Sequence, residues 1–167
     1  RAYNKGLLNA AFTGTLKIDI KKRIPVAAGL AGGSSNGAAV LHGLNKLWNL
    51  RMSLKELCEI GAELGSDVPF CLMNQAKANT MLGKSIVHDK MATAAAFATG
   101  TGTDLKPIKP FIGFVLLSKP SISVPTAEVY GGLKLDEIHN RPDNRKMIEA
   151  IEKTFTAFFP ISAISLF

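Results

Sequence analysis

The chain has 167 residues, a length that corresponds to about one ordinary domain. Hydrophobic residues make up 47% of it and charged residues 20%, which favours a globular core and excludes a disordered chain. The 20 Lys and Arg against 13 Asp and Glu give a formal net charge of +7. This excess predicts an anionic partner, which could be a nucleic acid, a membrane surface or a phosphorylated small molecule.

The cysteine content and the hydropathy exclude several further classes. Cys58 and Cys71 are too few for a disulfide framework or a four-thiolate zinc site, and their apolar neighbours indicate packed free thiols in a reducing compartment. No apolar run approaches the roughly eighteen residues that span a bilayer, and the apolar stretch near the start is too brief for a signal peptide. Because the chain begins at Arg1 without a Met, we expect a piece of a longer protein.

The first part of the chain predicts a strand, a loop and a helix in succession. Apolar and polar side chains alternate over residues 15–22, the period of a half-buried strand. A glycine-rich loop follows at residues 26–35 and closes on Ser34 and Ser35. Apolar residues then recur at helical spacing over residues 38–48, which predicts a helix with one of the two serines as its N-cap.

The second helix has the clearest local signals. Ser53 and Glu56 form a capping box ahead of apolar residues at helical spacing within residues 54–64. Gly65 predicts a left-handed C-cap for this helix. The apolar run at residues 68–73 is short enough to predict a buried strand.

The remainder of the chain has weaker patterns. Residues 74–103 lack a sustained period and are expected to form loops, with one helix around residues 85–98. Residues 112–117 have the composition of a buried strand, and a connector after them leads into a short helix at residues 126–130. A last helix is predicted at residues 143–151, with Met147, Ile148 and Ile151 facing inward.

The glycine-rich loop is the first candidate for chemistry. Small residues at positions 27–29 and 31–33 permit positive φ angles and let the backbone approach a ligand closely. Amide N–H groups that converge at the beginning of a helix bind phosphate, and the hydroxyls of Ser34 and Ser35 could bind phosphate oxygens or a magnesium ion. The loop lacks the lysine of a Walker A motif, and Ala31 breaks a G-x-G-x-x-G pattern. A tight strand-to-helix turn without a ligand is the alternative.

Asp67 is the second candidate for chemistry. A carboxylate between a helix end and an apolar run is held at the edge of the core, where it could accept the proton of an attacking hydroxyl or orient a neighbouring lysine. The alternative is a turn aspartate that caps local amides. The phosphate-type loop upstream favours the chemical role.

Three other features have plain structural interpretations. The basic residues 21–23 are expected to be a solvated strand end, and the alternative is that they help to attract an anionic substrate. His42, His88 and His139 lack metal-ligand spacing. Trp48 is expected to pack in the core.

Two segments together resemble the GHMP kinase superfamily. Residues 24–36, with the sequence I-P-V-A-A-G-L-A-G-G-S-S-N, are similar to its phosphate loop, and residues 65–70 read G-S-D-V-P-F. Residues 41–50 and 118–135 are similar to the superfamily members that act on a cytidine-diphosphate-linked methylerythritol. The resemblance is strong over residues 17–73 and looser toward the C-terminus.

This resemblance implies an α+β fold with two domains. Residues 1–112 would form the N-terminal ATP-binding domain, similar to domain 2 of ribosomal protein S5 and without its first strands. Residues 113–167 would begin a ferredoxin-like C-terminal domain, so that the fold in this chain is incomplete. The nucleotide would bind between the two domains.

The resemblance also implies an activity. The protein would use ATP and Mg²⁺ to phosphorylate the 2-hydroxyl of the methylerythritol unit, a step of non-mevalonate isoprenoid (terpenoid) biosynthesis. It would be a monomer or homodimer in the bacterial cytoplasm or a plastid, and would bind neither nucleic acid nor membrane.

The resemblance assigns roles to particular residues. Asp67 matches the catalytic aspartate, and Thr126 and Tyr130 match positions beside the acceptor, where the Tyr130 ring is suited to stack on cytosine. The hydroxyl of Ser35 would also hold Mg²⁺. The residues that would cradle the ATP phosphates all belong to the loop: Pro25, Ala28, Gly29, Leu30, Ala31, Gly32, Gly33, Ser34 and Ser35.

The chain departs from the superfamily pattern in four places. An N-terminal strand with the catalytic lysine and a third glycine-rich motif are absent, the stretch between Met73 and Ala95 resembles an insertion, and residues 98–103 lack the arginine and glutamate of a T-G-R-G-E-like hairpin. The alternatives are therefore a homoserine- or mevalonate-type kinase, a non-catalytic nucleotide-binding fragment, and a basic nucleic-acid-binding domain. Only 2 Tyr and 1 Trp and no recognised basic motif argue against the last.

Overall fold

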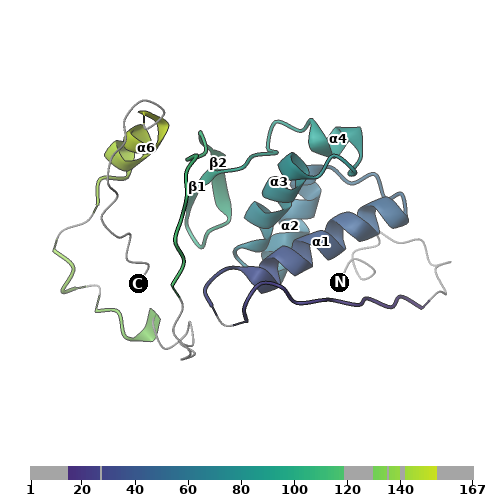
Figure 1. The fold of residues 1–167 in the computed structure, drawn as a ribbon, viewed down its shortest axis with the longest axis horizontal. Coiled ribbons are helices and arrows are strands. Elements are labelled where there is room, and N and C mark those ends of the chain that lie inside the picture. The colour runs from purple at the N-terminus through teal and green to yellow at the C-terminus, as the bar shows by residue number, and fades with distance from the viewer. Residues whose placement is uncertain (1–14, 27, 119–129, 135, 140–141, 154–167) are drawn as a thin grey trace.

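The computed structural model of the chain describes residues 15–26, 28–118, 130–134, 136–139 and 142–153. Within these residues four helices form a cluster, an antiparallel hairpin lies beside the cluster, and a further helix stands apart from both (Figure 1). The elements in chain order are α1 (Gly32–Leu47), α2 (Leu54–Leu64), α3 (Val68–Ala78), α4 (Lys84–Val87), β1 (Ala96–Thr99), β2 (Asp104–Pro107) and α6 (Asn144–Lys153). This mixture of helices and a small antiparallel sheet is consistent with the predicted α+β class.

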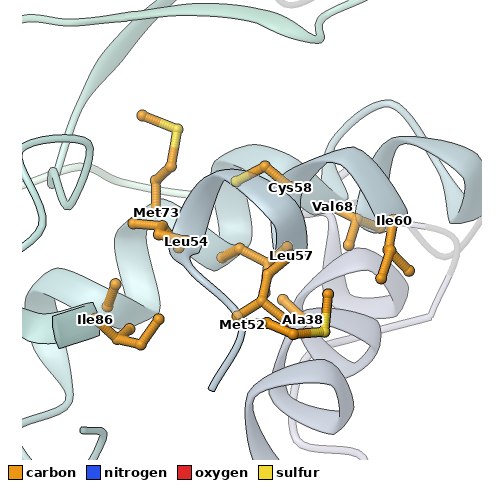
Figure 2. Close-up of a cluster of buried hydrophobic side chains, with 11 residues drawn as sticks. Ala38, Met52, Leu54, Leu57, Cys58, Ile60, Val68, Met73 and Ile86 are labelled. Atoms are coloured by element: carbon orange, nitrogen blue, oxygen red, sulfur yellow. The ribbon is translucent and has the colours of Figure 1, made fainter. Parts of the chain in front are cut away.

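The hydrophobic core lies between α1, α2 and α3, and Figure 2 shows its side chains. The core side chains with at most 1% exposure are Ala38, Leu54, Leu57, Leu72, Met73 and Ala76. The axes of α2 and α3 approach closely because Gly61 has no side chain. A Cβ at that position would lie 2.9 Å from Leu72 Cδ1 and 3.0 Å from Val68 Cγ1, closer than real Cβ contacts allow.

The beginning of α2 confirms the predicted capping box. The Ser53 hydroxyl accepts a hydrogen bond from the Glu56 amide at 3.3 Å, and the Glu56 carboxylate accepts one from the Ser53 amide at 2.8 Å. The predicted left-handed C-cap is wrong, because Gly65 has φ 170° and ψ 152°, which is extended backbone. The chain therefore leaves α2 extended and turns at residues 66–67 before α3 begins.

The predicted strand at residues 68–73 is wrong, because these residues open the helix α3. The helix packs against both α1 and α2, so its first turns carry apolar side chains on more than one face and lack the polar period that marks an exposed helix. Pro69 falls in the first turn, where its missing N–H would have no intrahelical partner in any case. The proline is therefore compatible with the helix.

The two predicted strands at residues 15–22 and 112–117 are wrong for a different reason. Both segments have no regular secondary structure, and their apolar side chains are exposed, Ile20 by 52% and Leu116 by 96%. A strand needs a neighbour to receive its hydrogen bonds. Among the described residues the one strand pairing joins β1 to β2, so neither segment has a partner strand.

Two helix predictions after residue 78 are confirmed in part. The helix expected around residues 85–98 is limited to α4, and residues 96–99 form β1 instead. The last helix is present as α6, and the Asp143 carboxylate caps it by accepting a hydrogen bond from the Lys146 amide at 3.1 Å. Its expected inward face is not buried, since Met147 is 51% exposed and α6 buries no residue.

Four of the residues for which we expect plain structural roles are buried or half-buried. Both cysteines are free thiols, Cys58 buried and Cys71 half-buried, and burial raises the pKa of Cys58 to about 12. His42 is buried, and Trp48 is half-buried at the end of α1. Across the described part of the chain, no helix has the length and apolar character needed to cross a membrane.

Candidate functional site

A cavity of about 590 Å³ opens where three turns of the chain meet. One wall is the beginning of α1, the second is the turn between α2 and α3, and the third is the turn between β1 and β2. The lining residues are Ser34, Ser66, Asp67, Ala98, Gly100, Thr101, Gly102 and Tyr130. The cavity thus brings together residues from three groups that the sequence analysis proposed separately: the glycine-rich loop, the aspartate and the acceptor position.

The first wall is the N-terminal turn of α1. The helix begins at Gly32, and its N-cap is Ala31 with a left-handed φ of 48° and no side-chain cap. The prediction of a serine N-cap is therefore wrong, because both glycines after Ala31 are already helical. Ser34 and Ser35 lie inside the first turn, and their hydroxyls are not used for capping.

The first turn leaves backbone donors for a ligand. The first backbone hydrogen bond of α1 runs from the Ser35 amide to the Ala31 carbonyl at 2.8 Å. The amides of Gly32, Gly33 and Ser34 precede it, and the first amides of a helix have no intrahelical acceptor. Such amides, together with the helix dipole, bind phosphate groups.

The loop ahead of α1 combines an open side with a packed side. A Cβ added to Gly33 would meet nothing within 4 Å, whereas one added to Gly32 would lie 2.9 Å from Ile24 Cγ2. The Cβ added to Gly32 would also lie 3.7 Å from Lys22 Nζ. Lys22 therefore places a positive charge beside the first turn of α1, which favours the alternative that residues 21–23 help to attract an anionic substrate.

The second wall presents the carboxylate of Asp67. This residue is the N-cap of α3, yet its side chain makes no capping hydrogen bond, so the alternative of a local capping aspartate does not hold. The side chain is exposed and lines the cavity. Burial and, to a smaller degree, the charge of Asp67 raise the pKa of the neighbouring Cys71 thiol. The arrangement leaves the carboxylate available to accept a proton from a bound molecule.

The third wall is the turn of the β1–β2 hairpin, in the segment where the family resemblance predicts a hairpin. Thr99 pairs with Asp104 in the sheet register, and its hydroxyl donates to the Asp104 carboxylate at 2.7 Å. Gly100 and Gly102 have φ angles of 64° and 96°, which favour glycine. A Cβ on Gly102 would lie 3.7 Å from the Ser66 carbonyl oxygen. The hairpin turn therefore lies directly against the turn that carries Asp67.

The remaining predicted site residues are placed differently. Tyr130 lines the cavity and is 70% exposed, whereas Thr126 lies outside the described residues. Ser34 is the one predicted phosphate-loop residue that lines this cavity. The Ser35 hydroxyl is instead close to α3, where Gln75 Nε2 donates to it at 3.3 Å and to the Ser35 carbonyl at 2.8 Å. No sequence signal marks Gln75, because its contact with Ser35 joins residues 40 positions apart.

The described residues contain no group of three or more His, Cys, Asp or Glu side chains that could hold a metal ion by themselves. Mg²⁺ that is bound to nucleotide phosphates needs only one or two protein oxygen ligands. One carboxylate, Asp67, lines the cavity together with the hydroxyl-bearing Ser34. This donor set fits a phosphate-bound magnesium ion and does not fit an all-protein metal cage.

Comparisons with known proteins agree with these features. Residues 1–75 match the family model described as GHMP kinases N terminal domain. A curated protein of Geobacillus sp. (strain WCH70), named 4-diphosphocytidyl-2-C-methyl-D-erythritol kinase, is 50% identical over 137 residues, which are 81% of this chain and 40% of that protein.

Two further curated proteins with that name are similarly related. The one from Bacillus subtilis (strain 168) is 50% identical over 139 residues, 83% of this chain and 41% of the relative. The one from Alkaliphilus metalliredigens (strain QYMF) is 42% identical over 146 residues, 87% of this chain and 44% of the relative. The chain thus spans less than half of the length of these relatives.

Proposed function

This chain belongs to the GHMP kinase family, and on that premise we propose that it is part of an ATP-dependent 4-diphosphocytidyl-2-C-methyl-D-erythritol kinase. The observation that carries the proposal is the single cavity lined by Ser34, Asp67 and Tyr130. The name shared by the relatives at 42–50% identity supports the choice of substrate. The protein would act in non-mevalonate isoprenoid biosynthesis.

The first turn of α1 would bind the ATP phosphates. Its three leading amides and the positive end of the helix dipole supply donors and potential for an anion. Lys22 adds a formal charge next to Gly32. The open side of Gly33 permits a phosphate group to approach the backbone.

Asp67 would act on the acceptor. The 2-hydroxyl oxygen of the acceptor attacks the γ-phosphorus, the bond from that phosphorus to the β,γ-bridging oxygen breaks, and ADP leaves. The hydroxyl proton passes to the Asp67 carboxylate, which the structure leaves without a capping bond. Phosphoryl transfer depends mainly on positioning and charge neutralisation, so a preformed cavity with these groups on its walls suits the reaction.

The other binding roles follow from the same cavity. Mg²⁺ bound to the triphosphate would neutralise phosphate charge, with a first-turn serine hydroxyl as an oxygen ligand. Ser35 is the ligand in the sequence prediction, and Ser34 is the serine that lines the cavity. The exposed ring of Tyr130 would stack on cytosine. Thr126 is proposed to lie beside the acceptor on the sequence pattern alone.

The division into domains is also a proposal. Residues 1–112 would form the ATP-binding domain and residues 113–167 the beginning of the C-terminal domain. The packing of α1 to α4 with one another supports a compact N-terminal unit, and the absence of buried residues in α6 is consistent with a helix that belongs to another unit. A soluble, cytoplasmic monomer or homodimer without nucleic acid remains a prediction.

The substrate assay uses the full-length protein that contains this chain. Transfer of the γ-phosphoryl group of ATP is measured with the cytidylyl methylerythritol substrate, homoserine and mevalonate, each at matched concentration. We expect phosphorylation of the first with at least tenfold preference. Preference for homoserine or mevalonate would refute the proposed substrate, and ATP binding without transfer to any of the three would favour a non-catalytic nucleotide-binding protein.

A further inference from the structure

We propose that Gln75 is a positioning residue that ties the first turn of α1 to α3 and so keeps the phosphate-binding amides in place relative to Asp67. The inference rests on the proposed function for its effect on ATP. The tie itself is a property of the fold. Gln75 is half-buried on α3, and its side chain reaches across to Ser35.

The hydrogen bonds define what the Gln75 side chain does. The Ser35 carbonyl oxygen can only accept, so the atom 2.8 Å from it is the amide nitrogen Nε2, which donates. The same nitrogen also donates to the Ser35 hydroxyl oxygen at 3.3 Å. Gln75 therefore holds one residue by both its backbone and its side chain.

The tie joins a rigid element to a weakly constrained one. Asp67 is the N-cap of the helix that carries Gln75, and this helix packs against α1 and α2 and contains the fully buried Leu72 and Met73. The first turn of α1 has no side-chain cap and contains two consecutive glycines, which have the largest backbone freedom. A side chain that fixes Ser35 therefore restrains the turn that would hold the ATP phosphates.

The hydrogen bonding of Gln75 also sets the role of the Ser35 hydroxyl. Because the oxygen accepts from Gln75, the hydroxyl keeps its own hydrogen for a second acceptor. Loss of Gln75 would leave both the Ser35 hydroxyl and the Ser35 carbonyl without this donor.

The neighbouring amide on α3 provides a matched control. Asn74 Nδ2 donates to the Ala94 carbonyl at 3.4 Å, a bond that ties α3 to the segment before β1 and does not touch α1. Replacement of either amide by leucine removes a side-chain donor from the same helix. Only the Gln75→Leu change removes the tie to Ser35.

The experiment compares Gln75→Leu and Asn74→Leu in the full-length protein. Hydrogen exchange of the amides of residues 35–39, measured without ligand, is expected to accelerate about two- to tenfold in Gln75→Leu, the range that corresponds to one net hydrogen bond. The KM for ATP is expected to rise by a similar factor, while the KM for the alcohol acceptor and kcat stay within about twofold. Asn74→Leu is expected to change none of these by more than about twofold.

The readouts separate positioning from a general loss of stability. A variant that is merely less stable loses active fraction, which lowers apparent kcat and leaves the KM for ATP unchanged. If Gln75→Leu does not fold, Gln75→Glu, which keeps the size and places acceptors against the Ser35 carbonyl, is expected to give the same exchange and KM changes. Exchange and ATP KM equal to those of Asn74→Leu would overturn the inference. A wild-type protein that binds no ATP would instead overturn the proposed function, and the ligand-free exchange would still decide whether the tie exists.

Discussion

The helical cluster and the segments that flank it both carry apolar side chains, yet these side chains are buried to very different extents. Leu54 and Leu72 of the cluster are 0% exposed, whereas Leu116 and Phe114 of the later flanking segment are 96% and 108% exposed. Helices form their backbone hydrogen bonds within a single segment. Their apolar side chains can therefore be buried by the packing of α1, α2 and α3 against one another alone. The flanking segments have a strand-like pattern, and a strand depends on a neighbour that the described residues do not supply.

This difference has a consequence for the proposed site. Two of the three cavity walls, the beginning of α1 and the turn with Asp67, belong to the packed cluster. Tyr130, which we propose to contact the alcohol acceptor, follows the exposed residues 112–117 in the sequence. The cluster therefore holds the groups that we propose for phosphate binding and catalysis on a packed base, which is what positioning in phosphoryl transfer requires.

The difference in burial between the two regions is tested most sharply by truncating one leucine in each. Leu72→Ala removes a fully buried side chain from the middle of the core and is expected to lower the free energy of unfolding by about 2–5 kcal/mol. Leu116→Ala removes a side chain that is 96% exposed and is expected to change it by less than about 0.5 kcal/mol. Denaturant unfolding of both variants checks this. Equal losses would show that residues 112–117 are packed as well as the cluster.

A second comparison tests the close approach of α2 and α3. Gly61→Ala places a Cβ 2.9 Å from Leu72 Cδ1 and is expected to destabilise the cluster by about 1–3 kcal/mol through overpacking. Gly43→Ala adds a Cβ on α1 with nothing within 4 Å and is expected to stabilise by about 0.5–1 kcal/mol through helix propensity. Thermal unfolding of the two variants measures whether each substitution raises or lowers the stability. A stabilising Gly61→Ala would contradict the packing described for these helices.

The buried histidine predicts how the stability of the cluster depends on pH. His42 Nε2 donates to the Leu72 carbonyl at 3.0 Å, and its Nδ1 is buried without a partner. Burial lowers the pKa of His42, only partly offset by that hydrogen bond. The unfolded chain therefore binds this proton at higher pH than the folded chain, so the free energy of unfolding falls as the pH drops below about 6.5.

The pH effect is tested by unfolding the protein between pH 7.5 and 5.5. We expect a decrease of up to about 1.4 kcal/mol per pH unit from this group, and a smaller slope in His42→Gln. His88→Gln, at an exposed position, serves as the control and is expected to keep the wild-type slope. An unchanged slope in His42→Gln would contradict the assignment.

The smallest expected effect concerns Lys22, the point where the earlier flanking segment meets the cluster. Lys22→Gln removes the charge beside Gly32 and is expected to weaken ATP binding about three- to tenfold. The reason is that a hydrogen bond or ion pair with a charged group contributes about 1 kcal/mol or more to binding. Lys17→Gln removes a charge that is 84% exposed and pairs with Asp19, and should change binding less than twofold. Calorimetric titration with ATP compares the two variants.

The sequence predicted those elements whose signals are local. The capping box at Ser53 and Glu56 identified α2, and helical spacing identified α1 and α6. The segment that became α3 was assigned to a strand because its burial against two helices removed the polar period. The strands predicted from alternation at residues 15–22 and 112–117 failed because pairing is not local.

The candidate site was predictable to a similar degree. The resemblance of the glycine-rich loop and of the Asp67 motif to one superfamily placed both in a common site, and the cavity brings Ser34 and Asp67 together. Attraction of an anionic substrate by residues 21–23 was one of two interpretations open from the sequence, and the contact with Gly32 singles out Lys22 among them. Gln75 could not be identified, since its role depends on a contact with Ser35 across the fold.

The role of Asp67 is tested most directly by Asp67→Asn in the full-length protein, with ATP binding and single-turnover phosphoryl transfer measured on the same sample. The amide keeps the size of the side chain and cannot take the acceptor proton. We predict an ATP Kd within about threefold of wild type and a transfer rate reduced by about 10²- to 10⁴-fold. A transfer rate near that of wild type would contradict the assignment of Asp67 to the chemical step.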